Sequence, residues 1–303
     1  MAKAAGFIFR YNKFLSYSIA LSFRMPSLQL KHQTLNLSQP QVMGILNVTQ
    51  DSFSDGGKFI DLSSAKKQAE QMLKAGAAII DIGGESTRPG AAPVSEQEEL
   101  DRVMPVIEWL APEADVSIDT SKAVVMREAI KAGVAMVNDV CALTQPNTLD
   151  VVAAADVPVC LMHMQGTPRT MQSNPTYDHV VDDIKVFFNE RIQVCNLSGI
   201  ESSRLILDPG FGFGKNTEHN VTLLNQLDHL VAMGYPILAG LSRKSLITQV
   251  IDKPADQRQA ASVALAIKAW QMGAAIIRVH DVDETVDALK MLDFVANFAG
   301  ETS

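Results

Sequence analysis

Three segments of the chain share one pattern, and this repetition limits the possible folds more than any other feature. Lys74 begins "KAGAAIIDIGG", Lys131 begins "KAGVAMVNDV" and Gln271 begins "QMGAAIIRVHDV". In each copy a helical segment ends, a glycine supplies the left-handed turn that commonly follows a helix, and a short apolar strand begins. Apolar strands that alternate with helices indicate a parallel sheet covered on both faces.

Eight such strands can be placed along the chain, with amphipathic helices between them. An open, doubly wound α/β sheet would show the same alternation, but eight strands in roughly 250 residues favour a (β/α)8 barrel. We therefore predict a single-domain α/β TIM barrel over residues 28–300, preceded by an N-terminal extension at 1–27. The predicted strands are 41–46, 77–82, 116–119, 135–139, 157–163, 204–208, 236–240 and 275–280, and the clearest helices are 64–76, 95–110 and 177–195.

Composition excludes several classes of function. A net charge of −8 over 303 residues argues against nonspecific nucleic-acid binding, which needs a dense basic surface. Cys141, Cys160 and Cys195 are widely spaced, so we interpret them as reduced, buried residues of a cytoplasmic protein. No apolar run is long enough to span a membrane.

The N-terminal extension contains no acidic residue, as is common in targeting peptides. We nevertheless interpret it as disordered or loosely docked rather than as a targeting peptide.

Polar residues stand where most of the predicted strands end. In a (β/α)8 barrel the active site forms there, from the loops that follow the strands. A single residue of this kind often caps a helix, but so many at one edge indicate a functional site. The residues at these strand ends and in the loops that follow, with Phe53 and Pro89 as the two apolar members, are Asn47, Phe53 and Asp55 after the first strand, Thr87, Arg88 and Pro89 after the second, Asp119, Asn138 and Asp208 at the third, fourth and sixth, Arg243, Lys244 and Ser245 after the seventh, and Arg278 and His280 at the eighth.

The acceptor residues in this set suit a flat heterocycle. Asp119, Asn138 and Asp208 would bind the NH and NH₂ edges of a pterin or a purine. The loop "GFGFGK" after the sixth strand lacks the spacing of a phosphate-binding loop, and we expect its glycines to let substrate approach the backbone. Neither an HExxH nor a GxSxG motif occurs, and we interpret His163 as a structural histidine.

The basic residues suit an anion. Arg88, Arg278 and His280 are expected to bind a phosphate or pyrophosphate, because a guanidinium makes bidentate contacts with such groups. A helix expected to begin at about Ser245 would offer its N-terminal amides to a second anion. Asn47 and the acids of its loop suit Mg²⁺ held on a pyrophosphate, since Mg²⁺ takes few oxygens from the protein itself.

Eight segments, in order, resemble the motifs of the dihydropteroate synthase family. They are "MGILNVTQDSFSDGG", "DIGGESTRPGA", "SIDTSK", "NDV", "MHMQGTPRTMQ", "LDPGFGFGK", "GLSRKS" and "RVHDV". The resemblance runs from about Leu35 to Phe298, and the ordered set is far more specific than any single motif. Gln50 and Ala123 depart from it, because the family commonly has proline at both positions.

The resemblance implies a transferase of folate biosynthesis. It would join 6-hydroxymethyl-7,8-dihydropterin pyrophosphate to 4-aminobenzoate, giving 7,8-dihydropteroate and pyrophosphate. It also implies Mg²⁺ as cofactor, a cytoplasmic homodimer, a target of sulfonamides, and no nucleic-acid or membrane partner. Our hypothesis for the mechanism is a dissociative substitution without a covalent nucleophile, in which Asp208 stabilises positive charge on the pterin ring.

Individual roles follow from the matching motifs. In the family, the loops after the first two strands close over the substrates. Asp208, Lys244, Asp119, Asp55 and Arg88 are the expected catalytic residues. The resemblance implies a pterin site at Asp119, Asn138, Asp208 and Lys244, a pyrophosphate site at Thr87, Arg278, His280 and Asn47 with Mg²⁺ near Asn47 and Asp55, and an aminobenzoate site at Phe53, Arg88, Pro89, Phe213, Lys244 and Ser245.

Three alternatives share part of this pattern. A methyltetrahydrofolate methyltransferase would use the pterin acids but would not need "STRPG", "SRKS" and "RVH". A degenerate homologue that binds pterin without turnover should have lost a loop or anion residue, and all are present in the sequence. A phosphate-binding isomerase would need a carboxylate base beside a carbonyl site, and no residue marks one.

Overall fold

The computed structural model describes residues 27–49, 62–87 and 90–298. Of the predicted extension, only Ser27 falls within these ranges, so the domain boundary remains a prediction. The elements are β1 (Ser27–Gln29), β2 (Thr34–Asn36), β3 (Gln41–Asn47), α1 (Leu62–Ala75), β4 (Ile79–Gly83), α2 (Glu96–Leu110), β5 (Val116–Asp119), α3 (Ala123–Ala132), β6 (Met136–Asp139), α4 (Thr148–Ala153), β7 (Val159–Met162), α5 (Val180–Leu197), η3 (Ser202–Arg204), β8 (Leu205–Asp208), α6 (Thr217–Asn225), α7 (Asp228–Val231), β9 (Leu238–Ala239), η4 (Ser245–Gln249), η5 (Ala255–Gln257), α8 (Gln259–Gln271), β10 (Ile276–Val279) and α9 (Val282–Asn297).

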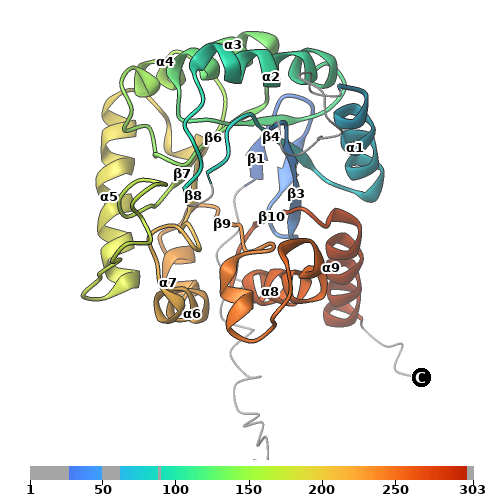
Figure 1. Ribbon diagram of the computed structural model, residues 1–303, viewed down its shortest axis with the longest axis vertical. Helices are drawn as coiled ribbons and strands as arrows, with labels where there is room; N and C mark the ends of the chain where they lie inside the picture. The colour runs from blue at the N-terminus through green and yellow to red at the C-terminus, as the bar shows by residue number, and fades with distance from the viewer. Residues whose placement is uncertain (1–26, 50–61, 88–89, 299–303) are drawn as a thin grey trace, which may run out of the picture.

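Strands β3 to β10 form a parallel barrel with the helices around its outside (Figure 1). Neighbouring strands pair in the order β8-β7-β6-β5-β4-β3-β10-β9. A parallel bridge between Leu207 and Ile237 joins β8 to the chain entering β9 and so brings the two edges of the sheet together. The predicted (β/α)8 barrel is confirmed, and every predicted strand overlaps an observed one.

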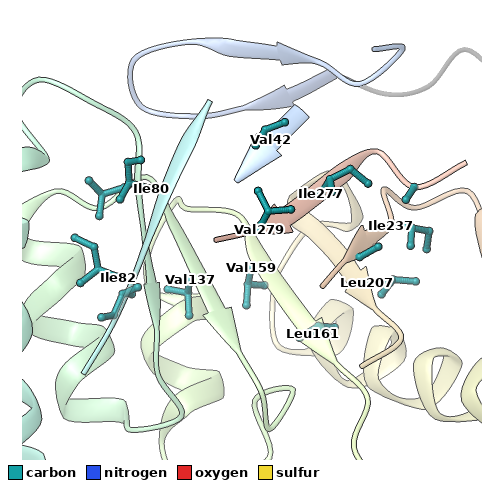
Figure 2. Close-up of a cluster of buried hydrophobic side chains, with 14 of the residues drawn as sticks. Val42, Ile80, Ile82, Val137, Val159, Leu161, Leu207, Ile237, Ile277 and Val279 are labelled. Atoms are coloured by element: carbon teal, nitrogen blue, oxygen red, sulfur yellow. The ribbon is translucent and has the colours of Figure 1, made fainter. Parts of the chain in front are cut away.

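The core lies mainly between the strands and the surrounding helices (Figure 2). Ile80 and Ile82 of β4 are fully buried and belong to the same cluster as Val103 of α2. Alternate residues of a strand face opposite sides of the sheet. Ile79 and Asp81 therefore face the barrel interior, where Ile79 packs in a second apolar cluster.

A short antiparallel hairpin, β1–β2, closes the barrel at the N-terminal ends of its strands. Leu28 and Leu35 pair across this hairpin and pack with Met43 in the interior cluster. Gln33, in its turn, donates to the carbonyl oxygen of Ala78 just before β4, at 3.2 Å. Our sequence analysis did not predict the hairpin, although leucines alternate with polar residues in "LQLKHQTLNL".

The repeat glycines adopt the backbone conformation that the pattern predicts. Gly76, Gly133 and Gly273 have φ of 104°, 96° and 97°. At the end of α3, the Gly133 amide donates to the carbonyls of Ala129 and Ile130. This left-handed turn returns the chain directly into the next strand, which is why helix and strand are separated by so few residues.

The helix expected at Ser245 requires a correction. Only the five-residue 3-10 helix η4 begins there, and the α-helix α8 begins at Gln259. The intervening "SLITQVIDKP" is rich in β-branched residues, which are weak helix formers, and Pro254 cannot continue a helix. The predicted helix at Ser245 is therefore wrong, and the short η4 offers no N-terminal site for the second anion.

The three cysteines are unpaired. Cys160 and Cys195 are buried, as predicted, whereas Cys141 is only partly buried. Burial raises the pKa of both core thiols. In the described part of the chain, no helix has the length and apolar character needed to cross a membrane.

Phe188 on α5 provides a test of the core. Its side chain is fully buried, whereas Val186 on the same helix is 57% exposed. Phe188→Ala should lower the free energy of unfolding by about 3–5 kcal/mol, because it leaves a cavity against the barrel. Val186→Ala should change it by less than about 0.5 kcal/mol. Urea denaturation checks both values, and equal losses would contradict the assigned core.

Candidate active site

Many of the predicted strand-end residues line one cleft at the C-terminal mouth of the barrel. The cleft is narrow and partly open to solvent. Of the predicted residues, it is lined by Thr87, Asp119, Asn138, Asp208, Phe213, Lys244 and Arg278. Sequence analysis did not single out its other lining residues, which carry no distinctive chemistry: Val140, Met162, Gly210, Phe211 and Gly240.

The Arg278 guanidinium connects three of the barrel strands. Its Nε donates to Asp81 Oδ2 on β4 and its Nη2 donates to Asp119 Oδ2 on β5, both at 2.6 Å. Asn138 on β6 donates its amide to the same Asp81 oxygen at 3.0 Å. In the sequence, Asp81 is one residue of the predicted strand 77–82, with no sign of this role. Its fully buried carboxylate holds an arginine and an amide in fixed orientations.

Electrostatic effects on Asp119 oppose each other. Burial raises the pKa of Asp119 to about 7, while Arg278 favours the charged carboxylate and Asp81 opposes it. The pKa of Arg278 is raised by Asp81 and Asp119 despite its burial. The guanidinium therefore stays charged beside two acids, and burial makes the Asp119 carboxylate easier to protonate than an exposed one.

Asp208, at the end of β8, lies on the opposite side of the cleft. Its Oδ1 accepts from the Gly210 amide at 2.7 Å, which turns the chain sharply after the strand. A Cβ at Gly210 would lie 2.0 Å from the carbonyl oxygen of His163, so only glycine fits there. Burial raises the pKa of Asp208, against the opposing effects of the Gly210 amide and Lys244.

Lys244 and Phe213 meet across the cleft. The Lys244 ammonium lies 4.1 Å from the centre of the Phe213 ring, a cation–π contact. Burial and the nearby charge of Arg278 lower the pKa of Lys244 to about 8, although Asp208 and Asp119 oppose this shift. The ammonium therefore has weak hydration and few protein partners, which suits it to bind a ligand.

Lys215 holds the glycine-rich loop after β8 in place through its buried side chain, a role that the sequence did not reveal. Its ammonium is buried and donates to the carbonyls of Gly210 and Phe213, both at 3.0 Å, and contacts His163 Nδ1 at 2.9 Å. Burial and Lys215 lower the pKa of His163 to about 3. His163 is thus a neutral, structural histidine that accepts from the lysine.

The loop after β4 is held in place by a second lysine, which is partly buried. Lys122 donates to the carboxylates of Glu85, in that loop, and of Glu99, on α2. Arg102 donates to the Gly84 carbonyl at 2.7 Å. These bonds fix the base of the loop that carries Thr87. Sequence analysis missed them because Lys122, Glu99 and Glu85 are far apart along the chain.

The loop after β9 is bonded to the end of β10. Arg243 has φ of 59° and makes a bidentate pair with Asp281, with Nη2 at 2.5 Å from Oδ1. Ser242 Oγ lies 3.0 Å from His280 Nδ1. Arg243, predicted only as a strand-end cation, therefore stabilises the loop rather than facing the cleft.

The remaining predicted residues are less closely assembled. Asn47 ends β3 beside Asp119, since a Cβ on Gly83 would lie 3.8 Å from Asn47 Oδ1 and 3.6 Å from Asp119 Cβ. His280 and Ser245 do not line the cleft, and Ser245 is exposed. Phe53, Asp55, Arg88 and Pro89 lie outside the described residues, as does Gln50.

The described residues contain no group of three or more His, Cys, Asp or Glu side chains arranged to bind a metal. Of the two residues expected near Mg²⁺, Asn47 and Asp55, only Asn47 is among the described residues. A single amide oxygen fits Mg²⁺ carried mainly by substrate phosphates and water, and it does not fit an ion held by the protein alone.

His163 predicts a measurable pH dependence. The pKa of this residue is about 3 when folded against an ordinary value of 6.5, so the unfolded chain binds the proton first and stability falls as pH drops below 6.5. His163→Gln keeps an acceptor for Lys215 but cannot titrate. As the pH falls from 6.5 to about 4.5, the unfolding free energy of this variant should fall less steeply than that of the unmodified protein. The two slopes should differ by about 1.4 kcal/mol per pH unit. Urea titrations at several pH values check this, and parallel curves would contradict it.

Sequence comparisons identify the relatives of this chain. The model of the pterin binding enzyme family matches residues 43–280. The dihydropteroate synthase of Haemophilus influenzae is 54% identical over 272 residues, which cover 89% of this chain and 99% of that protein. The Escherichia coli dihydropteroate synthase is 51% identical over 262 residues, covering 86% and 93%.

Solved structures agree with these relatives. Yersinia pestis dihydropteroate synthase, in complex with a sulfonamide drug, has a TM-score of 0.86 and 52% identity, covering 90% of this chain and 100% of that one. The Xanthomonas albilineans enzyme with 7,8-dihydropteroate has a TM-score of 0.82 and 46% identity, covering 90% and 100%. Likeness at this level extends well beyond the fold, and the chain belongs to the dihydropteroate synthase family of pterin-binding transferases.

Proposed function

We propose that this enzyme joins 6-hydroxymethyl-7,8-dihydropterin pyrophosphate to 4-aminobenzoate at the cleft described above. The observation that supports this most strongly is the shared cluster at Arg278, which unites a set of buried carboxylate and amide groups with a fixed guanidinium. A heterocycle with NH edges needs the carboxylate and amide acceptors, and a pyrophosphate needs the guanidinium. One substrate that carries both groups matches the cleft.

The pterin ring is assigned to the deepest part of the cleft. Asn138 and Asp208 are 4% and 6% exposed, so they would bind polar ring edges away from competing water. Asp119 lies on the adjacent strand β5, and Lys244 contributes a donor from the loop after β9. This arrangement offers acceptors to ring NH groups and a donor to a ring oxygen or nitrogen.

The pyrophosphate is assigned to Thr87, Arg278, His280 and Asn47. Asp81 already holds the Arg278 side chain in place, so little conformational freedom is lost when Arg278 binds an anion. Asn47 would hold Mg²⁺ through its amide oxygen, together with Asp55, which lies outside the described residues. When bound, Mg²⁺ would supply charge neutralisation to the leaving pyrophosphate.

The aminobenzoate is assigned to the outer part of the cleft, against Phe213 and Lys244, with the exposed Ser245 beyond the cleft lining. Phe53, Arg88 and Pro89 complete this proposed subsite from outside the described residues. The Yersinia pestis relative was solved with a sulfonamide drug. We place sulfonamides in the same subsite here, which would make this enzyme their target.

The chemistry follows from positioning and charge. The carbon–oxygen bond to pyrophosphate breaks early and its electron pair leaves with the pyrophosphate, the carbon–nitrogen bond to the aromatic amine forms, and the amine passes one proton to water. Asp208 accepts from the pterin ring and stabilises the positive charge that develops there, while Arg278 stabilises the departing anion. Asp119 and Lys244 hold the ring so that the methylene carbon faces the amine. No covalent nucleophile takes part.

Pyrophosphate release tests the proposal directly. The purified protein is given the pterin pyrophosphate with and without 4-aminobenzoate and Mg²⁺, and both products are followed. Release that depends on Mg²⁺ and matches dihydropteroate formation is expected. Tight pterin binding without either product would overturn the proposal and indicate a degenerate homologue.

Asp208→Asn tests the assigned role of that carboxylate. The amide retains an acceptor for Gly210 but loses the negative charge, so kcat should fall about 100-fold or more. The KM for 4-aminobenzoate should rise by less than about threefold. Steady-state kinetics measure both, with the exposed Asp228→Asn as a matched control. A change confined to KM would show that the role is wrong.

We also propose a homodimer in the cytoplasm. Helix α9 lies on the outside of the barrel (Figure 1). Met291, Phe294 and Val295 of α9, and Phe298 just after it, are each at least 58% exposed and recur at the three- and four-residue spacing of one helix face. Their spacing forms a continuous apolar stripe, which suits a second copy of the chain. The three unpaired cysteines fit a reducing compartment.

Phe294→Glu tests this surface. A buried charge in an apolar dimer interface is strongly unfavourable, so the variant should sediment as a monomer at concentrations where the unmodified protein is dimeric. Val186→Glu, on the exposed side of α5, serves as the matched control. Sedimentation velocity distinguishes the species. An unchanged dimer in Phe294→Glu would exclude α9 as the interface.

A further inference from the structure

The Ser242 hydroxyl contacts two nitrogen atoms of His280, one in the backbone and one in the ring. The hydroxyl oxygen accepts a hydrogen bond from the His280 backbone amide at 3.2 Å and lies 3.0 Å from the ring atom Nδ1. Ser242 is buried, with 6% of its surface exposed. A buried hydroxyl needs an acceptor for its own proton, since an unsatisfied buried polar group is costly.

The direction of the ring contact follows from counting protons. A serine hydroxyl has one proton to donate and two lone pairs to accept with. If His280 Nδ1 carried a proton, Ser242 would accept from both nitrogens and its own proton would lack a partner. Within the described chain, the only ring or carbonyl acceptor recorded beside this hydroxyl is Nδ1 itself.

We propose that Ser242 is a positioning residue that donates to His280 Nδ1 and so fixes the imidazole as its Nε2–H tautomer. The two ring nitrogens of a histidine are distinct, and the bond made by one decides which proton the other carries. His280 Nε2 makes no hydrogen bond to the described residues, and the side chain is only partly buried. The histidine therefore carries an N–H that no described residue accepts.

This inference rests on the proposed function, because it explains how His280 binds the pyrophosphate. Burial and the neighbouring cations Arg243, Arg278 and Lys244 lower the pKa of His280 to about 3, despite Asp281. The ring is thus neutral beside an already cationic site. With the opposite tautomer, a lone pair would face the anion and repel it.

Long-range ¹H–¹⁵N NMR of the histidine-labelled protein tests the tautomer without any reference to activity. The chain has six histidines, and the His280 signals are assigned by their loss in His280→Gln. The unmodified protein near neutral pH should show a protonated Nε2 and an unprotonated Nδ1. A protonated Nδ1 would overturn the inference, even if the enzyme is active.

Ser242→Ala should allow both tautomers and weaken the binding of inorganic pyrophosphate with Mg²⁺ about tenfold, whereas Ser242→Thr should restore both readouts. Calorimetry measures the affinity.

Ser117→Ala is the control. It removes a buried hydroxyl that has no hydrogen-bond partner among the described residues, and it should leave the tautomer and the affinity unchanged. If the Ser242→Ala spectrum shows the unmodified tautomer alone, the inference fails. If the tautomer is as proposed but pyrophosphate binds nowhere, the proposed function fails instead.

Discussion

The geometry of the mouth depends on the neutralisation of one buried carboxylate. Asp81 is inaccessible to solvent, and a charge in that position is tolerated only with a cation and further hydrogen bonds. Arg278 supplies the cation, and Asn138 donates a second bond to the same oxygen. The planar guanidinium transmits this orientation to Asp119 on the next strand. The groups assigned to the heterocycle and to the anion are therefore parts of one electrostatic unit.

The loops around the mouth follow the same principle. Segments without regular secondary structure leave backbone carbonyls unpaired, and buried cations can satisfy several of them at once. Lys215 does so for the glycine-rich loop, and Lys122 connects the loop after β4 to α2. Because these bonds are made by side chains, the loops keep defined positions while their backbones remain close to any ligand.

The barrel and much of the cleft were predictable from the sequence, because both depend on local order along the chain. The regular alternation of apolar strands and glycine-capped helices determines the topology, and this topology places the C-terminal ends of all strands at one mouth. Contacts between distant residues were not predictable in this way. Asp81 looked like an ordinary strand residue, Lys215 ended a glycine-rich loop that was expected only to let substrate approach, and no local pattern links Lys122 to Glu99. The helix expected at Ser245 failed because β-branched residues and a proline outweighed the motif.

The hairpin β1–β2 has a consequence for how the protein can be handled. It seals the end of the barrel opposite the mouth, and the chain enters the described fold through it at Ser27. Any polypeptide joined ahead of Ser27 is therefore attached on the far side from the cleft. An affinity tag, a surface tether or a fused partner enzyme placed there would leave the entrance for both substrates open.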